Sequence, residues 1–230
     1  MLPAYNEEAV IAQTVSAVEA TLCQLADDYE IIVVNDGSRD RTGEIVARIS
    51  QEHPAVRLIN HPHNLGYGAA LGTGFRAATR DLVFLTDSDQ QFDVRELARF
   101  LPLLREADLI IGYRQPRMDP WIRRLNGWGW NLLVRLLFGY TARDVDCAFK
   151  LFRRSVLDHF KIESTGATFS AEFLIRARRA GFRIRELRVS HYPRPAGEAT
   201  GAKPHVILRA FRELARLRLR LWTEGRGGSA

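Results

Sequence analysis

Short apolar stretches alternate with helix-like stretches through the first half of this 230-residue chain. The strand-like stretches fall at 30–34, 56–60, 82–86 and 108–113, and the helix-like ones at 7–25, 42–51, 67–79 and 94–105. Strands that are apolar along their length are buried on both faces, and such alternation builds parallel sheets between layers of helices. The pattern predicts an α/β fold with a mostly parallel sheet. A further helix near 168, a stop at Gly181 and a strand up to 187 extend it.

The first residues read as the exit from a strand that is itself missing. Residues 2–7, LPAYNE, lead directly into the first helix-like stretch, with Asn6 as its expected cap. A parallel sheet needs a strand before such an exit. We therefore expect a start codon assigned too late or a shortened chain, with an unpaired sheet edge as the consequence.

Positive charge is concentrated at the C-terminus. The formal net charge is +6, and residues 201–230 contain seven Lys or Arg against two Glu. Within them, 205–221 has helical spacing, and its apolar face comprises Ile207, Ala210, Phe211, Leu214, Leu217 and Leu221. We expect a body of residues 1–200 and a basic amphipathic helix and tail of residues 201–230. A basic tail points to an anionic partner, either a nucleic acid or a membrane surface.

The tryptophans favour the membrane. All four lie in two arginine-rich segments, at Trp121, Trp128 and Trp130 and at Trp222. Trp and Arg together are typical of the membrane interface, so 121–140 and 205–222 are the expected membrane-contacting segments. Two alternatives stay open. The terminal helix packs on the sheet with its arginines in water, or the charge binds nucleic acid, although no RNP, zinc or helix-turn-helix pattern accompanies it.

The rest of the composition bounds the compartment. Only two cysteines occur, Cys23 and Cys147, without C-x-x-C spacing, which fits a reducing compartment rather than a disulfide framework. No signal peptide and no apolar run long enough to span a bilayer is recognised. The expected location is cytoplasmic, peripheral at the cytoplasmic face of the membrane.

Two acidic turns follow strand-like stretches. Residues 82–92, LVFLTDSDQQF, end a buried strand with Asp87, Asp89 and Gln91. At a strand end, side chains two residues apart can point the same way, so both carboxylates and the amide oxygen could reach one Mg²⁺ or Mn²⁺. The alternative is two solvated aspartates in a turn, which the buried strand before them disfavours. The turn at 35–38, NDGS, is either an ordinary turn or a nucleobase or ribose contact through Asp36.

A dinucleotide-binding fingerprint is a competing interpretation. Glycines at 66, 68 and 72 open a helix, and Asp87 follows Gly66 by 21 residues. The unit is not the first β-α element, its last glycine is one place late, and residues 61–65 intervene before the glycines. NAD binding is therefore disfavoured.

Five short motifs occur in one order along nearly the whole chain. They are PAYNE (3–7), VVNDGSRDRT (33–42), N-x-G-Y-G-x-A (64–70), TDSDQQF (86–92) and R-P-x-G (194–197). Together they resemble family 2 glycosyltransferases, and most closely the dolichyl- and polyprenyl-phosphate sugar transferases. The resemblance implies a GT-A, Rossmann-like fold, a nucleoside-diphosphate sugar donor and a divalent cation, Mg²⁺ or Mn²⁺.

The resemblance also implies roles for particular residues. The implied donor-binding set is Pro3, Tyr5, Glu7, Asp36, Gly66, Asp87, Arg194 and Lys203. The implied metal ligands are Asp87, Asp89 and Gln91. Arg114 and Arg124 would bind an acceptor phosphate, and the residues expected at the reacting centre are Asp89, Arg114, Asp144 and Glu172. Two departures from the family pattern are Ala148, where glycine is common, and a longer segment before Lys203.

The expected function is inverting, metal-dependent transfer of a sugar from GDP-mannose or a UDP-sugar to a polyprenyl or dolichyl phosphate. One alternative is transfer to a saccharide or other soluble acceptor. The processive polysaccharide synthases of the family commonly carry a Q-x-x-R-W signature, which the chain lacks. The other alternative is a non-catalytic module that binds nucleotide sugars or docks on membranes.

Overall fold

The computed structural model describes residues 1–195 and 204–227, and side chains throughout these ranges except at 123, 204–208 and 225–227. The strands are β1 (Leu2–Ala4), β2 (Ile31–Asn35), β3 (Val56–Asn60), β4 (Leu82–Leu85), β5 (Leu109–Arg114), β6 (Lys150–Arg153) and β7 (Ile184–Val189). The α-helices are α1 (Ile11–Leu25), α2 (Thr42–Glu52), α3 (Tyr67–Ala77), α4 (Trp121–Phe138), α5 (Phe169–Arg179) and α6 (Pro204–Gly227). The 3₁₀ helices are η1 (Val94–Arg99), η2 (Leu101–Arg105) and η3 (Arg154–Asp158).

The strands confirm a mixed, mostly parallel sheet. β1, β2 and β3 pair in parallel, and a second group has the order β4-β6-β5-β7, in which only β6 is antiparallel to its neighbours. Met1 joins the two groups, because its amino group donates to the Phe84 carbonyl (2.8 Å) and its carbonyl accepts from the Thr86 amide (3.3 Å). β6 was not predicted, and the helix predicted at 94–105 is two 3₁₀ helices, with Pro102 in the first turn of η2.

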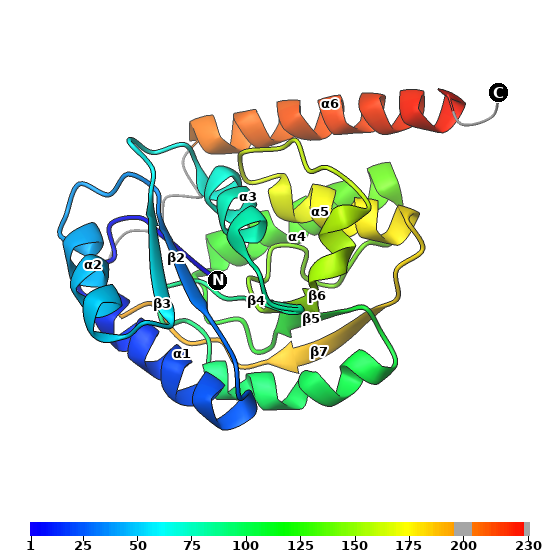
Figure 1. The fold of residues 1–230 in the computed structure, drawn as a ribbon. Coiled ribbons are helices and arrows are strands. Elements are labelled where there is room, and N and C mark those ends of the chain that lie inside the picture. The colour runs from blue at the N-terminus through cyan, green and yellow to red at the C-terminus, as the bar shows by residue number, and fades with distance from the viewer. Residues whose placement is uncertain (196–203, 228–230) are drawn as a thin grey trace.

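Helices cover both faces of the sheet, as Figure 1 shows. Alternation along β2 explains this, since Ile31 and Val33 belong to the core under α1 and α2, whereas Ile32 and Val34 belong to the core under α3 and α5. A third cluster packs η1 and η2 against β5 and β6. The fold is therefore a three-layer α/β/α arrangement. The carboxyl ends of β1, β2, β4 and β5 meet along one edge of it.

The expectation of a missing first strand is wrong. Residues 2–4 form β1, and this short strand lies inside the sheet, in register with Val33 to Asn35 of β2. The predicted cap is also wrong, because α1 begins at Ile11 and the Asn6 side chain accepts a hydrogen bond from the Arg39 amide instead. Tertiary contacts with the loop after β2 thus decide the path of residues 5–10.

Most of the apolar face of α6 packs on the body, while Phe211 and Trp222 are each 50% exposed. Ala210, Leu214, Leu217 and Leu221 are buried, and the three leucines belong to the core cluster that also contains Phe173 of α5. Figure 1 shows α6 lying across α3 and α5. Packing on the body, the alternative weighed above, is what the structure shows for these four residues. Within the described part of the chain, no helix is both long and apolar enough to cross a bilayer.

Candidate active site

The turn after β4 projects two aspartates from a backbone that is held on both sides. Between them, the Ser88 hydroxyl donates to the Pro3 carbonyl (2.8 Å), and the Ser88 carbonyl accepts from the Thr14 hydroxyl (2.9 Å). Ser88 is thereby anchored to β1 and α1. The flanking Asp87 and Asp89 carboxylates are neighbours whose charges repel each other.

The Asp87 carboxylate is strongly perturbed by its surroundings. Burial, and after it the charge of Asp89, raise the pKa of Asp87 to about 7. The Tyr67 hydroxyl donates to Asp87 Oδ1 (3.0 Å) and opposes this shift. Two close carboxylates of this kind are the donor set expected for a divalent cation that takes its other ligands from phosphate and water. Among the described residues no group of three or more Asp, Glu, His or Cys side chains could hold a metal alone.

A strap formed by residues 191–195 crosses the acidic turn. Gln91 and Tyr192 exchange two hydrogen bonds, from the Tyr192 amide to the Gln91 carbonyl (2.9 Å) and from Gln91 Nε2 to the Tyr192 carbonyl (3.0 Å). This brings Arg194 against Glu7, with which it forms an ion pair, and to 3.8 Å from Asp89. The guanidinium of Arg194, more than 100 residues after the turn in sequence, therefore stands beside the aspartates. Gln91 is buried there too, but its role as a metal ligand stays a prediction.

Asp36 holds the loop that precedes α3. It is 3% exposed, and its carboxylate accepts from the amides of Leu65 and Gly66 (2.9 Å each) and contacts His61 Nδ1 (2.7 Å). Gly66 has φ +102°, and a Cβ there would lie 3.0 Å from the Thr165 carbonyl oxygen, so glycine is needed. Asp36 thus organises the start of α3, where Tyr67 reaches Asp87. A base contact by Asp36 stays a prediction.

Arg114, at the end of β5, is held by a pair of carboxylates. Its Nε and Nη2 donate to the two oxygens of Asp144, each at 2.7 Å, and its Nη1 lies 3.8 Å from Asp119. Arg117 Nε donates to the same Asp119 (2.6 Å). Burial alone would raise the pKa of Asp144, but the Arg114 guanidinium outweighs it and holds that pKa below its usual value. Both arginines are therefore oriented before any ligand arrives.

His191 supports the loop after β5 that carries Arg117, and it makes the free energy of unfolding depend on pH. It is 4% exposed, its Nδ1 accepts from the Met118 amide (3.2 Å), and burial, with the nearby Arg114 charge, lowers its pKa to about 4. The unfolded state takes up a proton on this histidine at a higher pH than the folded state does. The contribution of the neutral His191 ring to the free energy of unfolding is therefore complete above about pH 6.5 and is lost as pH falls toward 4. We expect a loss of about 2 kcal/mol between pH 7 and 4.5.

Urea unfolding across this pH range measures that loss. His191→Asn keeps an acceptor for the Met118 amide but removes the titrating ring, so its pH slope should be flatter than that of the wild type. Equal slopes for the two proteins would contradict the assignment.

Two predicted site residues, Glu172 and Arg124, have no described contact with the aspartates. Glu172 on α5 is 0% exposed, and its carboxylate accepts from the Ser164 amide (2.8 Å) and hydroxyl and from Arg176 Nε (2.7 Å), with no described contact to the acidic turn. Glu172 instead supports the loop whose Thr165 carbonyl accepts from the Ala69 amide of α3. Arg124 is exposed on α4. Lys203 lies outside the described residues.

Sequence reasoning missed two residues of the site. Tyr67 was present in the N-x-G-Y-G-x-A motif, but only the fold places its hydroxyl on Asp87. Lys150 is 1% exposed on β6, opposite Leu85 and Ile111, and its ammonium donates to the Val145 and Cys147 carbonyls. A lysine within an apolar strand was the available signal, because such a charge is buried only where it is paired.

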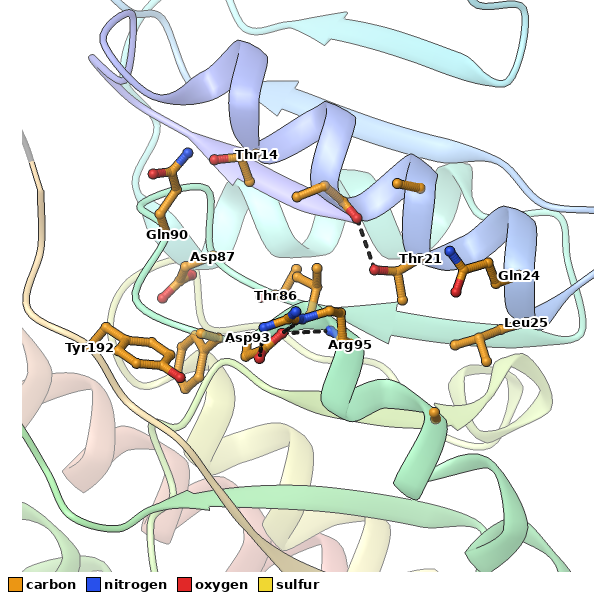
Figure 2. A pocket seen from close by; sticks show the side chains of 15 residues that line it. Thr14, Thr21, Gln24, Leu25, Thr86, Asp87, Gln90, Asp93, Arg95 and Tyr192 are labelled. Atoms are coloured by element: carbon orange, nitrogen blue, oxygen red, sulfur yellow. Dashed lines mark hydrogen bonds and ion pairs between the residues drawn. The ribbon is translucent and has the colours of Figure 1, made fainter.

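A groove of about 520 Å³ runs from the acidic turn along α1. Figure 2 shows Asp87 and Tyr192 at one end and Gln24 and Leu25 at the other. The pair Asp93–Arg95 lines the η1 side. Asp87 is therefore reachable from solvent through this groove.

The solved structure of glucosyl-3-phosphoglycerate synthase from Mycobacterium tuberculosis, in complex with Mn²⁺, UDP-glucose and phosphoglyceric acid, has the same fold. The TM-score is 0.74 over 94% of this chain and 78% of that chain, at 19% sequence identity. This confirms the predicted GT-A class of fold.

Curated relatives cover most of this chain. The glycosyltransferase AglD of Haloferax volcanii is 35% identical over 84% of the chain, which spans 33% of the length of AglD. The dolichyl-phosphate beta-glucosyltransferase ALG5D of Trichomonas vaginalis is 28% identical over 97% of the chain and 74% of its own length. The family model described as glycosyl transferase family 2 matches residues 1–160. With the acidic turn, the fold and these matches in agreement, the chain belongs to glycosyl transferase family 2.

Proposed function

We propose that this chain transfers a sugar, with inversion, from a nucleoside diphosphate to a polyprenyl phosphate. The observation that carries the proposal is the close pair of carboxylates after β4, with Arg194 at 3.8 Å from one of them. Such a cluster suits a ligand that brings a metal ion and phosphates together. The dolichyl-phosphate transferase named above supports the acceptor class.

In this proposal the donor diphosphate lies between the acidic turn and the strap. Asp87 and Asp89 would hold Mg²⁺ or Mn²⁺, with Gln91 as a further ligand, and Arg194 would leave Glu7 to meet the diphosphate. The cation, when bound, offsets the negative charge that grows on the leaving diphosphate. Asp36, Gly66, Pro3 and Tyr5 would shape the pocket for the nucleoside.

The acceptor phosphate attacks from the side of β5. Its oxygen forms a bond to the anomeric carbon while the bond from that carbon to the diphosphate oxygen breaks, so the configuration inverts. The phosphate is already ionised and needs no general base. Arg114 would direct this oxygen, and Asp144 would keep the guanidinium in place through its two hydrogen bonds. Arg124, on exposed α4, would meet the acceptor phosphate as it arrives from the membrane.

A transfer assay tests the proposal. UDP-glucose, UDP-N-acetylglucosamine and GDP-mannose are each supplied with Mn²⁺ or Mg²⁺, with a polyprenyl phosphate or with 3-phosphoglycerate as acceptor. We expect a metal-dependent product only with the lipid phosphate. Transfer to 3-phosphoglycerate instead would establish a soluble acceptor. Nucleotide binding unaffected by metal, with no transfer, would reject the donor site.

A lipid acceptor requires a surface that meets the membrane, and α4 has one. Its buried side contains Val134 and partly buried neighbours, yet a second row of large apolar side chains faces solvent. We call this row the α4 stripe; it comprises Trp121 (71% exposed), Leu125 (55%), Trp128 (63%), Leu132 (39%) and Leu136 (75%). The spacing of these residues places them on one helical face. We propose that the α4 stripe, and not the buried leucines of α6, lies in the membrane interface.

Changing Leu136 to Asp should weaken binding to lipid vesicles about 10- to 100-fold, because inserting one leucine into the interface contributes about 1.5–3 kcal/mol. Vesicle co-sedimentation measures this. Ser16→Asp adds the same charge on the exposed side of α1 and should bind like the wild type. Equal loss in both variants would mean that net charge, and not the α4 stripe, governs binding.

A further inference from the structure

A second groove, of about 370 Å³, lies where α4, α5 and α6 meet, away from the acidic turn. Three guanidinium groups line it, those of Arg178, Arg179 and Arg218. Its apolar wall includes Leu137, Phe138 and Leu221. The groove thus offers concentrated positive charge next to hydrocarbon.

The described residues that line this groove include no carboxylate. Two glutamates lie next to residues of the groove, and each already accepts hydrogen bonds from other donors. Glu224 accepts from Arg176 (3.1 Å and 3.2 Å), and Glu186 accepts from the Tyr140 hydroxyl and the Arg143 amide. The positive charge of the groove is therefore not neutralised by its own lining.

Most of the guanidinium hydrogens remain available to a ligand. Arg178 Nε donates to the Thr141 carbonyl (2.7 Å), and Arg179 Nη1 donates to the Leu221 carbonyl (3.0 Å). These bonds fix two guanidiniums in place but use only one donor of each, out of five. Arg218 is exposed, and no hydrogen bond or ion pair joins its side chain to the residues that the structure describes. Of the three arginines, Arg218 therefore contributes least to the described contacts within the fold.

The groove lies at the C-terminal end of α4, where the α4 stripe also ends, but on another side of the helix. Leu136, the last residue of the stripe, precedes Leu137 and Phe138 of the groove wall, and Tyr140 lines the groove beyond the end of the helix. A molecule held here would have its charge on the arginines and its apolar part against Leu137, Phe138 and Leu221. Anionic phospholipids have this build, with a phosphate next to acyl chains.

We propose that this groove binds the phosphate headgroup of an anionic membrane phospholipid. The inference rests on the proposed membrane contact of the α4 stripe, and it adds a selective site to that contact. Binding there would hold the domain in one orientation on the bilayer, because the stripe supplies apolar contact along α4 and the groove anchors one end of that helix.

Vesicle binding by two matched variants tests the site. Arg218→Gln removes one guanidinium from the groove. Arg216→Gln removes the same charge two residues away, from an exposed position of α6 that does not line the groove.

Vesicles are made of phosphatidylcholine alone or mixed with phosphatidylglycerol. We expect Arg218→Gln to bind the anionic vesicles about five-fold more weakly than the wild type, as expected for one basic residue at an anionic surface. Arg216→Gln should change binding by less than about two-fold, because that charge meets no headgroup.

Several results would overturn the proposal. Equal losses in the two variants would reduce the effect to general attraction between charges. Wild-type binding that does not distinguish the two kinds of vesicle would contradict a headgroup site. Calorimetry showing that glycerol phosphate alone binds as tightly as the anionic vesicles would contradict it too.

Sugar transfer to a detergent-solubilised acceptor separates this site from the proposed function. It should be unchanged by Arg218→Gln, and its absence from the wild type would reject the transferase proposal while leaving the vesicle result standing.

Discussion

Asn in place of Asp89 will lower the rate of sugar transfer about 100- to 1,000-fold, the range observed when one preorganised charge-stabilising group is removed from a reacting centre. Oδ1 of Asp89 accepts the Gln91 amide (3.2 Å), and an asparagine oxygen can accept the same bond. The local fold should therefore persist while the negative charge that would bind the cation is lost. Steady-state transfer measured over a range of Mn²⁺ concentrations checks this, with kcat reported separately from the metal requirement.

Asp81→Asn is the matched control. Asp81 is exposed and immediately precedes the other end of β4, so the substitution removes an equal charge from the opposite edge of the sheet. Transfer by this variant should equal that of the wild type. If Asp89→Asn kept full activity with an unchanged metal requirement, the acidic turn would not be the donor site.

Asn in place of Asp144 should have the largest effect on stability, a loss of about 3–5 kcal/mol, because it removes the only carboxylate that is hydrogen-bonded to the buried Arg114 guanidinium among the described residues and leaves Asp119 at 3.8 Å. The Arg114 and Asp144 side chains are 11% and 9% exposed, so water screens little of the loss. Urea unfolding at neutral pH measures it. The pKa of Asp144 is lowered in the folded state. The contribution of the Arg114–Asp144 pair to the free energy of unfolding is therefore complete above about pH 4 and is lost as pH falls further.

Two comparisons make the Asp144 result specific. Glu106→Gln breaks an ion pair with Arg185 in which the side chains are 58% and 61% exposed, and should cost less than about 1 kcal/mol. Replacing both members of the buried pair, as Arg114→Met with Asp144→Leu, should recover part of the stability because no charge is left unpaired. A double variant less stable than Asp144→Asn alone would show that the pair is not the cause.

The two proposed lipid contacts bear on how the acceptor reaches the site. The α4 stripe begins at Trp121, seven residues after Arg114 leaves β5, and runs to Leu136 at the other end of the helix. Arg124 stands in the first turns of this same helix. A bilayer lying along α4 would therefore present a lipid phosphate to the β5 side of the acidic turn, while the groove at the far end anchored the helix.

Local patterns in the sequence determined the main elements and the acidic turn. Buried strands need continuous apolar runs and helices need apolar residues every three or four positions, and both signals are local, so β2 to β5, α1 to α3 and α5 were all predictable. Asp87 and Asp89 were recognisable for the same reason, since a strand that ends in two carboxylates has few structural uses. The family motifs extended this to Asp36, Arg114 and Arg194.

Only the tertiary structure decided which partner each surface and charge received. The amphipathic pattern of residues 205–221 suits a membrane or a protein core equally well, and only the structure shows that Leu214, Leu217 and Leu221 pack in the core whereas Phe211 is exposed. Glu172 likewise found Ser164 and Arg176 rather than the acidic turn. β6 inserts antiparallel between β4 and β5, and this brings Lys150 and Asp144 close to Asp87 and Arg114. Such pairings join residues far apart in the chain, and a local pattern of hydrophobicity or charge carries no information about the distant side chain that will meet it.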